Sequence, residues 1–438
     1  MLLLEHGTII DPLSKKEWVA DILVDGKKIK KIGQNLAAEL SAEGCPAEKK
    51  SGEVSENVTR IDVSGKYVLP GLVDVHVHFR DPGFTYKEDI ESGAKAAAKG
   101  GVTTVVLMAN TKPAVDNEET LKYVLEKGGT TGIHVETCTT ITKGMQGQEL
   151  VDMETLKAAG AKGFTDDGVP ILEENLVRRA MEQAKALSMP LSFHEEDPAF
   201  IQNNGINAGK AAAHFGIGGS NREAEISLVA RDLEIALETG ACVNVQHIST
   251  REAVELVRQA KEKGGDVHAE ATPHHIVLTE DAAIQYGTMA KMNPPLREEE
   301  DRQAIIDALL DGTIDLIATD HAPHSAEEKA KAITEAPSGI IGLETALSLC
   351  FEELVQKAGM PMTVLMEKMA LNPAQMYHLD AGYIGEGGPA DLCVFDANAV
   401  WTPKSFLSKS QNSPFVDRTL KGVVDYTIVE GEIVYKNR

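Results

Sequence analysis

The sequence predicts an α/β fold: a TIM-like (β/α)8 barrel with a small β-sandwich domain formed by both termini. Two observations lead to this prediction. The middle of the chain alternates short apolar runs with amphipathic helical stretches, which is typical of parallel strands joined by helices. Both ends consist instead of short strand-like runs separated by turn signals. We therefore expect residues 1–66 and 384–438 to form the two parts of the β domain, and residues 67–383 to form the barrel.

The first part of the β domain is predicted from short apolar runs bounded by turns. Residues 7–12 and 22–27 have the alternation and the Asp-Pro or Asp-Gly turns of hairpins, and residues 63–68 read as a further strand. Residues 35–59 are polar and mixed, so we expect an exposed loop there, with a turn at residues 49–52. The second part of the domain has three strand-like runs, at residues 390–396, 423–429 and 433–435.

Eight β-like runs predict the barrel. They lie at residues 73–79, 103–110, 134–140, 160–167, 191–196, 242–249, 267–274 and 315–323. Helical patterns separate them, for example at residues 173–187, 222–239 and 299–311. Glycines stand where these helices should end. Eight is the number of strands that closes a (β/α)8 barrel. A doubly wound open sheet is the alternative, but it would want a glycine-rich phosphate-binding turn after its first strand, and none is present.

The composition of the chain limits the kinds of molecule that the protein is expected to bind. The chain has 438 residues and a net charge of −24, which argues against nucleic acid or an anionic membrane and leaves a small molecule as the expected partner. No apolar stretch is long enough for a transmembrane helix, and the N-terminus lacks the basic region of a signal peptide. The cysteines are widely spread and form no CxxC pair, which predicts free thiols in the cytoplasm rather than disulfides or a thiolate zinc site. They are Cys45, Cys138, Cys242, Cys350 and Cys393.

Polar residues stand where the predicted barrel strands end. Residues two apart share a strand face, so His76 and His78 can both point inward. Since the carboxyl ends of barrel strands meet at one mouth, four histidines and at least two carboxylates should converge there. Burying such a set without a cation is unfavourable, which predicts one or two divalent ions, with zinc favoured over manganese, cobalt or iron. The remaining members of the set are Asp166 or Asp167, His194, His247 and Asp320.

Two segments carry a family resemblance. Residues 74–83 (DVHVHFRDPG) resemble the first signature of the dihydroorotases, and residues 318–329 (ATDHAPHSAEEK) resemble the second. The similarity extends over almost the whole chain and is greatest to the bacterial type I branch of this family of metal-dependent amidohydrolases. In that branch residues 164–168 (FTDDG) stand in place of a lysine-bearing fourth strand.

The resemblance implies an activity and a set of site residues. The activity is the reversible cyclisation of N-carbamoyl-L-aspartate to L-dihydroorotate plus water, in pyrimidine (UMP) biosynthesis. The cofactor is Zn²⁺, two ions per subunit, bridged by Asp167 and hydroxide. The first ion is held by His76, His78 and Asp320, and the second by His194 and His247. Asp320 is also implied as the catalytic acid and base. The implied substrate-binding residues are His78, Arg80, Asn110, Asn293, His324, Ser338 and Gly339.

Several alternatives stay open at this point. Alternation lets only one of Asp166 and Asp167 point inward, and Asp167 is chosen from the family pattern. Many relatives bridge their metals with a carbamylated lysine, for which Lys162 would be the candidate. Ser338 stands where the family has an aromatic residue, so packing over the substrate ring is expected to be looser. The rival functions are hydantoinase, dihydropyrimidinase or allantoinase, and a non-catalytic scaffold. The expected assembly is a homodimer, and some family members associate with aspartate transcarbamoylase.

Overall fold

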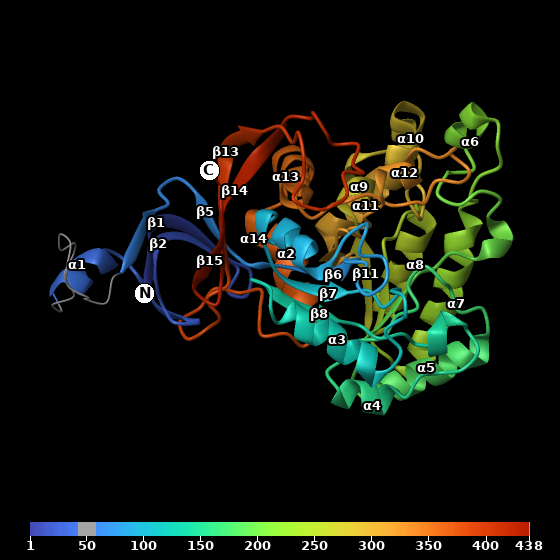
Figure 1. Cartoon of the computed structure of the whole chain (residues 1–438), viewed down its shortest axis with the longest axis horizontal. Helices are drawn as coiled ribbons and strands as arrows, with labels where there is room; N and C mark the ends of the chain where they lie inside the picture. Colours follow the sequence, from blue (N-terminus) through green and yellow to red (C-terminus); the bar gives the residue numbers. More distant parts are fainter. Residues whose placement is uncertain (43–57, 438) are drawn as a thin grey trace.

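A parallel barrel forms the larger part of the molecule (Figure 1). The computed structural model describes residues 1–42 and 58–437. The barrel strands are hydrogen bonded in two parallel groups, in the orders β6-β7-β8 and β12-β11-β10-β9. The strands are β6 (Leu72–Val77), β7 (Val102–Leu107), β8 (His134–Thr137), β9 (Leu191–Phe193), β10 (Val243–Val245), β11 (Val267–Ala271) and β12 (Leu316–Ile317).

Isolated bridges join the two groups into a closed barrel. Phe164 bridges both Thr139 after β8 and Leu191 in β9, and therefore takes the place of the fourth strand. Val77 in β6 bridges His321 after β12, which closes the ring. The predicted (β/α)8 barrel is confirmed. Within the predicted strand at residues 160–167 only Phe164 forms bridges, although the backbone N–H groups of Lys162 and Thr165 also donate to the carbonyls of Thr137 and Thr139.

Helices surround the barrel and cover its strands. The three helices predicted in detail agree with α5, α7 and α11 to within one residue at each end. The longer helices are α2 (Ile90–Lys99), α3 (Glu118–Gly128), α4 (Met153–Ala158), α5 (Glu174–Ala186), α6 (Lys210–Phe215), α7 (Glu223–Thr239), α8 (Arg251–Glu262), α10 (Glu280–Tyr286) and α11 (Glu299–Asp311). The shorter ones are α9 (Pro273–Val277), α12 (Ala326–Lys329), α13 (Ala346–Cys350), α14 (Met362–Met366) and α15 (Asn372–Met376). The described residues also include the π-helical segments η4 (Phe351–Lys357) and η5 (Glu367–Leu371) and the 3-10 turns η1 (Lys143–Met145), η2 (Pro198–Phe200) and η3 (Gly287–Ala290).

Strands from both ends of the chain form one sheet, as predicted. Its order is β15-β14-β13-β5-β1-β2-β3, with β4 paired to β1. Buried side chains from most of these strands share one core, so the predicted β-sandwich is built as a continuous sheet that curls around it. The strands are β1 (Leu2–Asp11), β2 (Lys16–Asp25), β3 (Lys28–Gly33), β4 (Thr59–Asp62), β5 (Tyr67–Pro70), β13 (Leu392–Trp401), β14 (Leu420–Val429) and β15 (Glu432–Lys436).

The predicted loop at residues 35–59 is partly wrong. Leu36 begins helix α1 (Leu36–Ala42), because its side chain packs with Leu3 and Leu23 against the sheet. The middle of that loop, with Cys45 and the predicted turn at residues 49–52, lies outside the described residues. Cysteines in the described part of the chain are free thiols, in agreement with the sequence.

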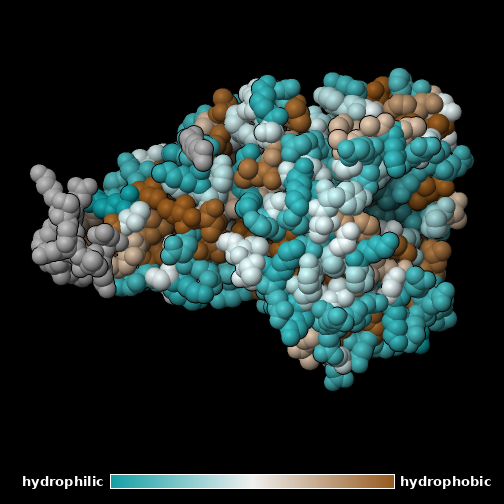
Figure 2. All heavy atoms as spheres, viewed as in Figure 1, coloured by the Kyte–Doolittle hydropathy of each residue, from teal (hydrophilic) through white to brown (hydrophobic). Residues whose placement is uncertain are grey.

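The terminal sheet packs directly on the barrel. Cys393, Phe395 and Val429 belong to the same core cluster as the barrel helices, and the hydroxyl of Thr427 donates to the carbonyl of Ala98 at 2.6 Å. Hydrophilic side chains cover most of the barrel face seen in Figure 2, whereas hydrophobic side chains gather over the terminal sheet. Among the described helices, none combines the length and the apolar character needed to span a bilayer.

Candidate metal centre

Two histidines of the first barrel strand begin a polar cluster at the carboxyl end of the barrel. His76 lies in β6 and His78 follows its end, so their side chains share one face of the strand. Nε2 of His76 lies 3.4 Å from Oδ1 of Asp167, and Nε2 of His78 lies 3.5 Å from Oδ2 of the same residue. Both rings are buried, which excludes the exposed alternating edge that a lone HxH pattern would also allow.

Two further histidines reach Asp167 from the other side of the barrel. Nδ1 of His194 lies 2.9 Å from Nε2 of His247, and these nitrogens lie 3.8 and 4.0 Å from Oδ1 of Asp167. The potential ligand atoms thus form two groups that share one carboxylate, with the atoms of each group within 4.8 Å of one another. The groups are His76, His78 and Asp167, and Asp167, His194 and His247.

Asp320 adds a second carboxylate to the first group. Its Oδ1 lies 3.1 Å from Nε2 of His78 and 3.6 Å from Nε2 of His76. The backbone here is strained, because Asp320 and His247 have φ values of +47° and +32°, a region that non-glycine residues rarely adopt. Such strain costs about 1–3 kcal/mol per residue and persists where surrounding structure enforces it, typically at functional sites.

The cluster fits a pair of divalent metal ions. The buried Nε2 of His76 has no hydrogen-bond partner within the described residues, and the facing nitrogens of His194 and His247 can share only one proton. Burial raises the pKa of Asp167, but His76, His78 and His194 lower it well below its usual range, so the residue is a carboxylate. Imidazole nitrogens around a bridging carboxylate are a donor set that suits zinc and similar ions.

The structure separates the two adjacent aspartates and moves Lys162 away from the cluster. Oδ1 of Asp166 accepts hydrogen bonds from the backbone N–H groups of Ile141 and Thr142, at 2.8 and 3.1 Å, so this side chain ties down a loop. Lys162 instead pairs with Glu136 at 3.7 Å and is partly exposed. Asp167 alone of these three residues therefore points into the cluster.

Three of the predicted substrate-binding residues border the cluster. Arg80, with a φ of +59°, donates from Nε to the carbonyl of Pro323 at 3.4 Å. Burial lowers the pKa of His78, and the charge of Arg80 lowers it further, which reflects how near the guanidinium lies. Oδ1 of Asn110 lies 2.9 Å from Nδ1 of His78, and its Nδ2 donates to Oδ2 of Asp167 at 2.9 Å. Asn110 therefore orients two potential ligands.

Asn293 and His324 are two further predicted substrate-binding residues, and each contacts a different part of the site. Nδ2 of Asn293 lies 3.2 Å from Nε2 of His194, and its buried Oδ1 has no partner in the described residues. Burial, Arg80 and two nearby lysines lower the pKa of His324, so the ring is neutral, and its Nε2 lies 2.8 Å from the carbonyl of Ser338. Gly339 follows with a φ of +112°, and a Cβ there would lie 2.6 Å from that of Ala322, so only glycine fits.

Two residues that the sequence did not single out support this arrangement. Glu270 in β11 is fully buried, and its Oε2 lies 2.9 Å from Nδ1 of His76. A carboxylate within a predicted barrel strand was the signal that could have revealed it. Asn412 accepts from the backbone N–H of His324 at 3.1 Å and donates to the carbonyls of Ala322 and Gly339. It lies outside the predicted barrel, so nothing in the sequence pointed to it.

A comparison with known proteins assigns the family. The model described as the amidohydrolase family matches residues 67–434. The chain belongs to the amidohydrolase family. A curated relative from Clostridioides difficile (strain 630), named dihydroorotase, is 54% identical over 435 residues, which cover 99% of this chain and 100% of the relative. Another from Clostridium acetobutylicum, also named dihydroorotase, is 49% identical over 440 residues and covers both chains fully.

Solved structures show how widely this fold is shared. This amidohydrolase superposes on the L-hydantoinase (dihydropyrimidinase) from Arthrobacter aurescens with a TM-score of 0.86, over 99% of this chain and 96% of that one. The D-hydantoinase (dihydropyrimidinase) from a Thermus species gives a TM-score of 0.82 over 99% and 95%. Each is 24% identical to this chain, so the likeness establishes the barrel with its terminal β domain and not the substrate.

Proposed function

We propose that this amidohydrolase is a dihydroorotase, which interconverts N-carbamoyl-L-aspartate and L-dihydroorotate. The observation that carries the proposal is the position of Arg80 and His324 beside the histidine and aspartate cluster, because the substrate of a dihydroorotase bears a carboxylate next to the reacting amide. The identity of 46–54% to full-length relatives named dihydroorotase supports it.

The candidate ligands are arranged for two ions that share Asp167. His76, His78 and Asp320 would hold one Zn²⁺, and His194 with His247 would hold the other. Bound zinc lowers the pKa of a water molecule to about 7 and polarises an amide carbonyl. The cluster is buried at the carboxyl end of the barrel, where barrel enzymes place their chemistry.

The residues of this chain then bind the substrate and move one proton. Ring opening adds the oxygen of water to the carbonyl carbon, breaks its bond to the ring nitrogen and transfers a proton to that nitrogen. Asp320, 3.1 Å from His78, is positioned to take the proton from water and deliver it to the leaving nitrogen. Ring closure runs through the same steps in reverse. Arg80 and Asn110 anchor the substrate carboxylate with His324, while Asn293 and the backbone at Ser338 and Gly339 contact the ring.

Dihydroorotate and dihydrouracil test the proposal, because the second ring lacks only the carboxylate. We expect kcat/KM for dihydroorotate to exceed that for dihydrouracil and for hydantoin. Arg80→Met should reduce kcat/KM for dihydroorotate about 10- to 100-fold, the size of a lost charge-assisted hydrogen bond, and leave that for dihydrouracil unchanged. Faster turnover of the uncharged rings by the unaltered enzyme would assign it to the hydantoinases instead. No turnover of any ring by the zinc-loaded protein would favour the scaffold alternative.

The wider cellular context is proposed on the same basis. A place in pyrimidine biosynthesis, a cytoplasmic location, a homodimer and an association with aspartate transcarbamoylase all stay predictions from the family resemblance. Analytical ultracentrifugation of the purified protein, alone and mixed with a transcarbamoylase, measures the two assemblies directly.

A further inference from the structure

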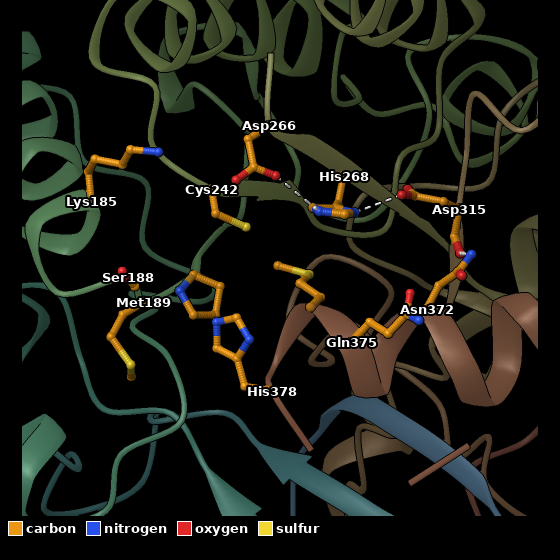
Figure 3. A pocket seen from close by; sticks show the side chains of 12 residues that line it. Lys185, Ser188, Met189, Cys242, Asp266, His268, Asp315, Asn372, Gln375 and His378 are labelled. Atoms are coloured by element: carbon orange, nitrogen blue, oxygen red, sulfur yellow. Dashed lines mark hydrogen bonds and ion pairs between the residues drawn. The ribbon is translucent and has the colours of Figure 1, made fainter. Parts of the chain in front are cut away.

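A second group of potential metal ligands lies at the opposite end of the barrel. Cys242 stands directly before β10, Asp266 directly before β11, and His268 is the second residue of β11. These are amino ends of barrel strands, whereas the cluster around Asp167 lies at the carboxyl ends. The three residues line a cavity of about 520 Å³, and Figure 3 shows the Cys242 thiol and the Asp266 carboxylate on the same side of the His268 ring.

The spacing of these side chains suits a tetrahedral ion. The ligand atoms of Cys242, Asp266 and His268 lie within 4.8 Å of one another. Two ligands of a tetrahedral zinc ion lie roughly 3.3–3.6 Å apart for bonds of about 2.0–2.3 Å. Nε2 of His268 lies 3.6 Å from Oδ1 of Asp266, which matches that separation and is too long for a good hydrogen bond.

The other nitrogen of His268 is held as in known metal sites. Its Nδ1 lies 2.7 Å from Oδ2 of Asp315, whose Oδ1 accepts from the backbone of Ala269 at 3.1 Å. A histidine ligand usually donates its second N–H to a carboxylate in this way, which fixes the tautomer and turns the free nitrogen toward the metal. Here the free nitrogen is Nε2, and it faces Asp266 and the cavity (Figure 3).

The charges around His268 favour a cation. The ring of His268 lies between two carboxylates, with Nε2 3.6 Å from Oδ1 of Asp266 and Nδ1 2.7 Å from Oδ2 of Asp315, so this position favours a positive charge. A divalent ion bound at Nε2 would supply that charge. Lys185, on the rim of the cavity, and Lys261, 3.1 Å from Asp315, offset part of the negative charge. The thiol and Asp266 are partly exposed, so an ion can reach them from solvent.

We propose that Cys242, Asp266 and His268 form a third metal site, selective for zinc or a similar thiolate-binding divalent ion and separate from the catalytic cluster. Water from the cavity supplies the fourth ligand. Sulfur, imidazole and carboxylate ligands together select zinc over magnesium or calcium. The ligands of this site come from two neighbouring strands, so they form no CxxC pair or other local motif in the sequence.

Cobalt distinguishes this site from the catalytic one. Full-length protein is stripped of metal with a chelator and titrated with Co²⁺ alone. The proposed catalytic ligands are nitrogens and oxygens, so only the third site can give a thiolate-to-cobalt charge-transfer band in the near ultraviolet. We expect that band to saturate at one ion per chain. It should disappear in Cys242→Ala, and it should require at least tenfold more Co²⁺ in His268→Gln.

Control variants and an activity assay distinguish metal binding at Cys242 from binding at other thiols or at the catalytic cluster. Cys45→Ala and Cys138→Ala remove other thiols and should keep the band. Cys242→Ala should bind one metal fewer per chain, unfold without metal at the temperature of the unaltered metal-free protein and keep its dihydroorotase rate within about twofold. A band that is missing from the unaltered protein, or that survives in Cys242→Ala, overturns the proposal. Neither result affects the proposed function, which is measured by turnover.

Discussion

Asp167 is the residue on which both candidate ligand groups depend. One of its oxygens lies 3.4 Å from Nε2 of His76 and 3.8 Å from Nδ1 of His194, so its loss removes a ligand from each group. Asp167→Ala should therefore bind less than one zinc ion per chain, whereas Lys162→Ala should retain two. Metal analysis after dialysis against a weak chelator measures both variants. Loss of zinc from Lys162→Ala would instead support the carbamylated-lysine alternative.

Glu270 is a positioning residue for His76. A carboxylate on the far nitrogen of a histidine ligand orients the ring and raises its basicity, and its removal typically costs 10- to 100-fold in metal affinity. Glu270→Gln keeps the side-chain volume but loses the charge, so we expect zinc to bind about tenfold more weakly. Activity should recover in excess zinc. Competition with a chromogenic chelator measures the affinity.

Glu136→Gln is the matched control, because Glu136 also lies on a barrel strand but pairs with Lys162 outside the cluster. Its zinc affinity should equal that of the unaltered protein. If Glu270→Gln lowers only the melting temperature and leaves zinc affinity unchanged, Glu270 contributes packing and not ligand orientation.

For single residues, the sequence points to functional side chains where the residue type is unusual for its position in a strand. Histidines and aspartates at strand ends stand out, and the structure brings His76, His78, His194 and His247 together as expected. Alternation could not choose between Asp166 and Asp167, because it says that the two side chains face opposite ways and not which of them faces the barrel axis. Glu270 escaped attention because one acid in a strand has no pattern of its own.

One side chain from the C-terminal segment hydrogen bonds to both of two loops at the mouth of the barrel. Asn412 bonds to the backbone of His324, Ala322 and Gly339, and it is buried. Asn412→Ala leaves these backbone groups without partners, each at about 1–3 kcal/mol if they stay buried. The loops should shift, and KM for dihydroorotate should rise roughly tenfold with a smaller change in kcat.

Steady-state kinetics of Asn412→Ala beside Asn398→Ala tests this role. Asn398 is an exposed residue of β13, so the same substitution there should change neither KM nor stability. A lower melting temperature with an unaltered KM would show that Asn412 supports the fold alone.

The three helices predicted with bounds, α5, α7 and α11, agree with the structure to within one residue because helix boundaries have local signals. Thr250 caps α8 by accepting from the backbone N–H of Ala253, and Gly240 ends α7 in a left-handed conformation. Strand four was predicted at residues 160–167, but its short extent was not, because the bridges of Phe164 to Thr139 and Leu191 depend on the neighbouring strands and not on its own sequence. The pairing of Asn412 with loops about 75–90 residues earlier in the chain likewise has no local signal.

The terminal sheet and the barrel form one structure although the sequence divides them. The change from strand-like runs to alternating strand and helix patterns predicted domain boundaries after residues 66 and 383, and these boundaries stay a prediction. Contacts across them are extensive: Ser408 bonds to Glu88 near α2, and the hydroxyl of Ser348 donates to the carbonyl of Gly422 at 2.8 Å. The sequence did not predict these contacts. Strand patterns indicate which strands a domain contains, and they do not indicate which surface the domain packs against.

A chain that ends at residue 383 should therefore fail to fold as a stable barrel. It lacks Cys393, Phe395 and Val429, which fill the barrel's own core, and Asn412, which closes its mouth. We expect the full chain to unfold in a single cooperative transition and the shortened chain to show none, to bind no zinc tightly and to have no measurable turnover. Differential scanning calorimetry with metal analysis checks this, and a chain lacking only the last two residues serves as the control. A shortened chain that melts cooperatively and holds two zinc ions would show that the barrel folds without residues 384–438.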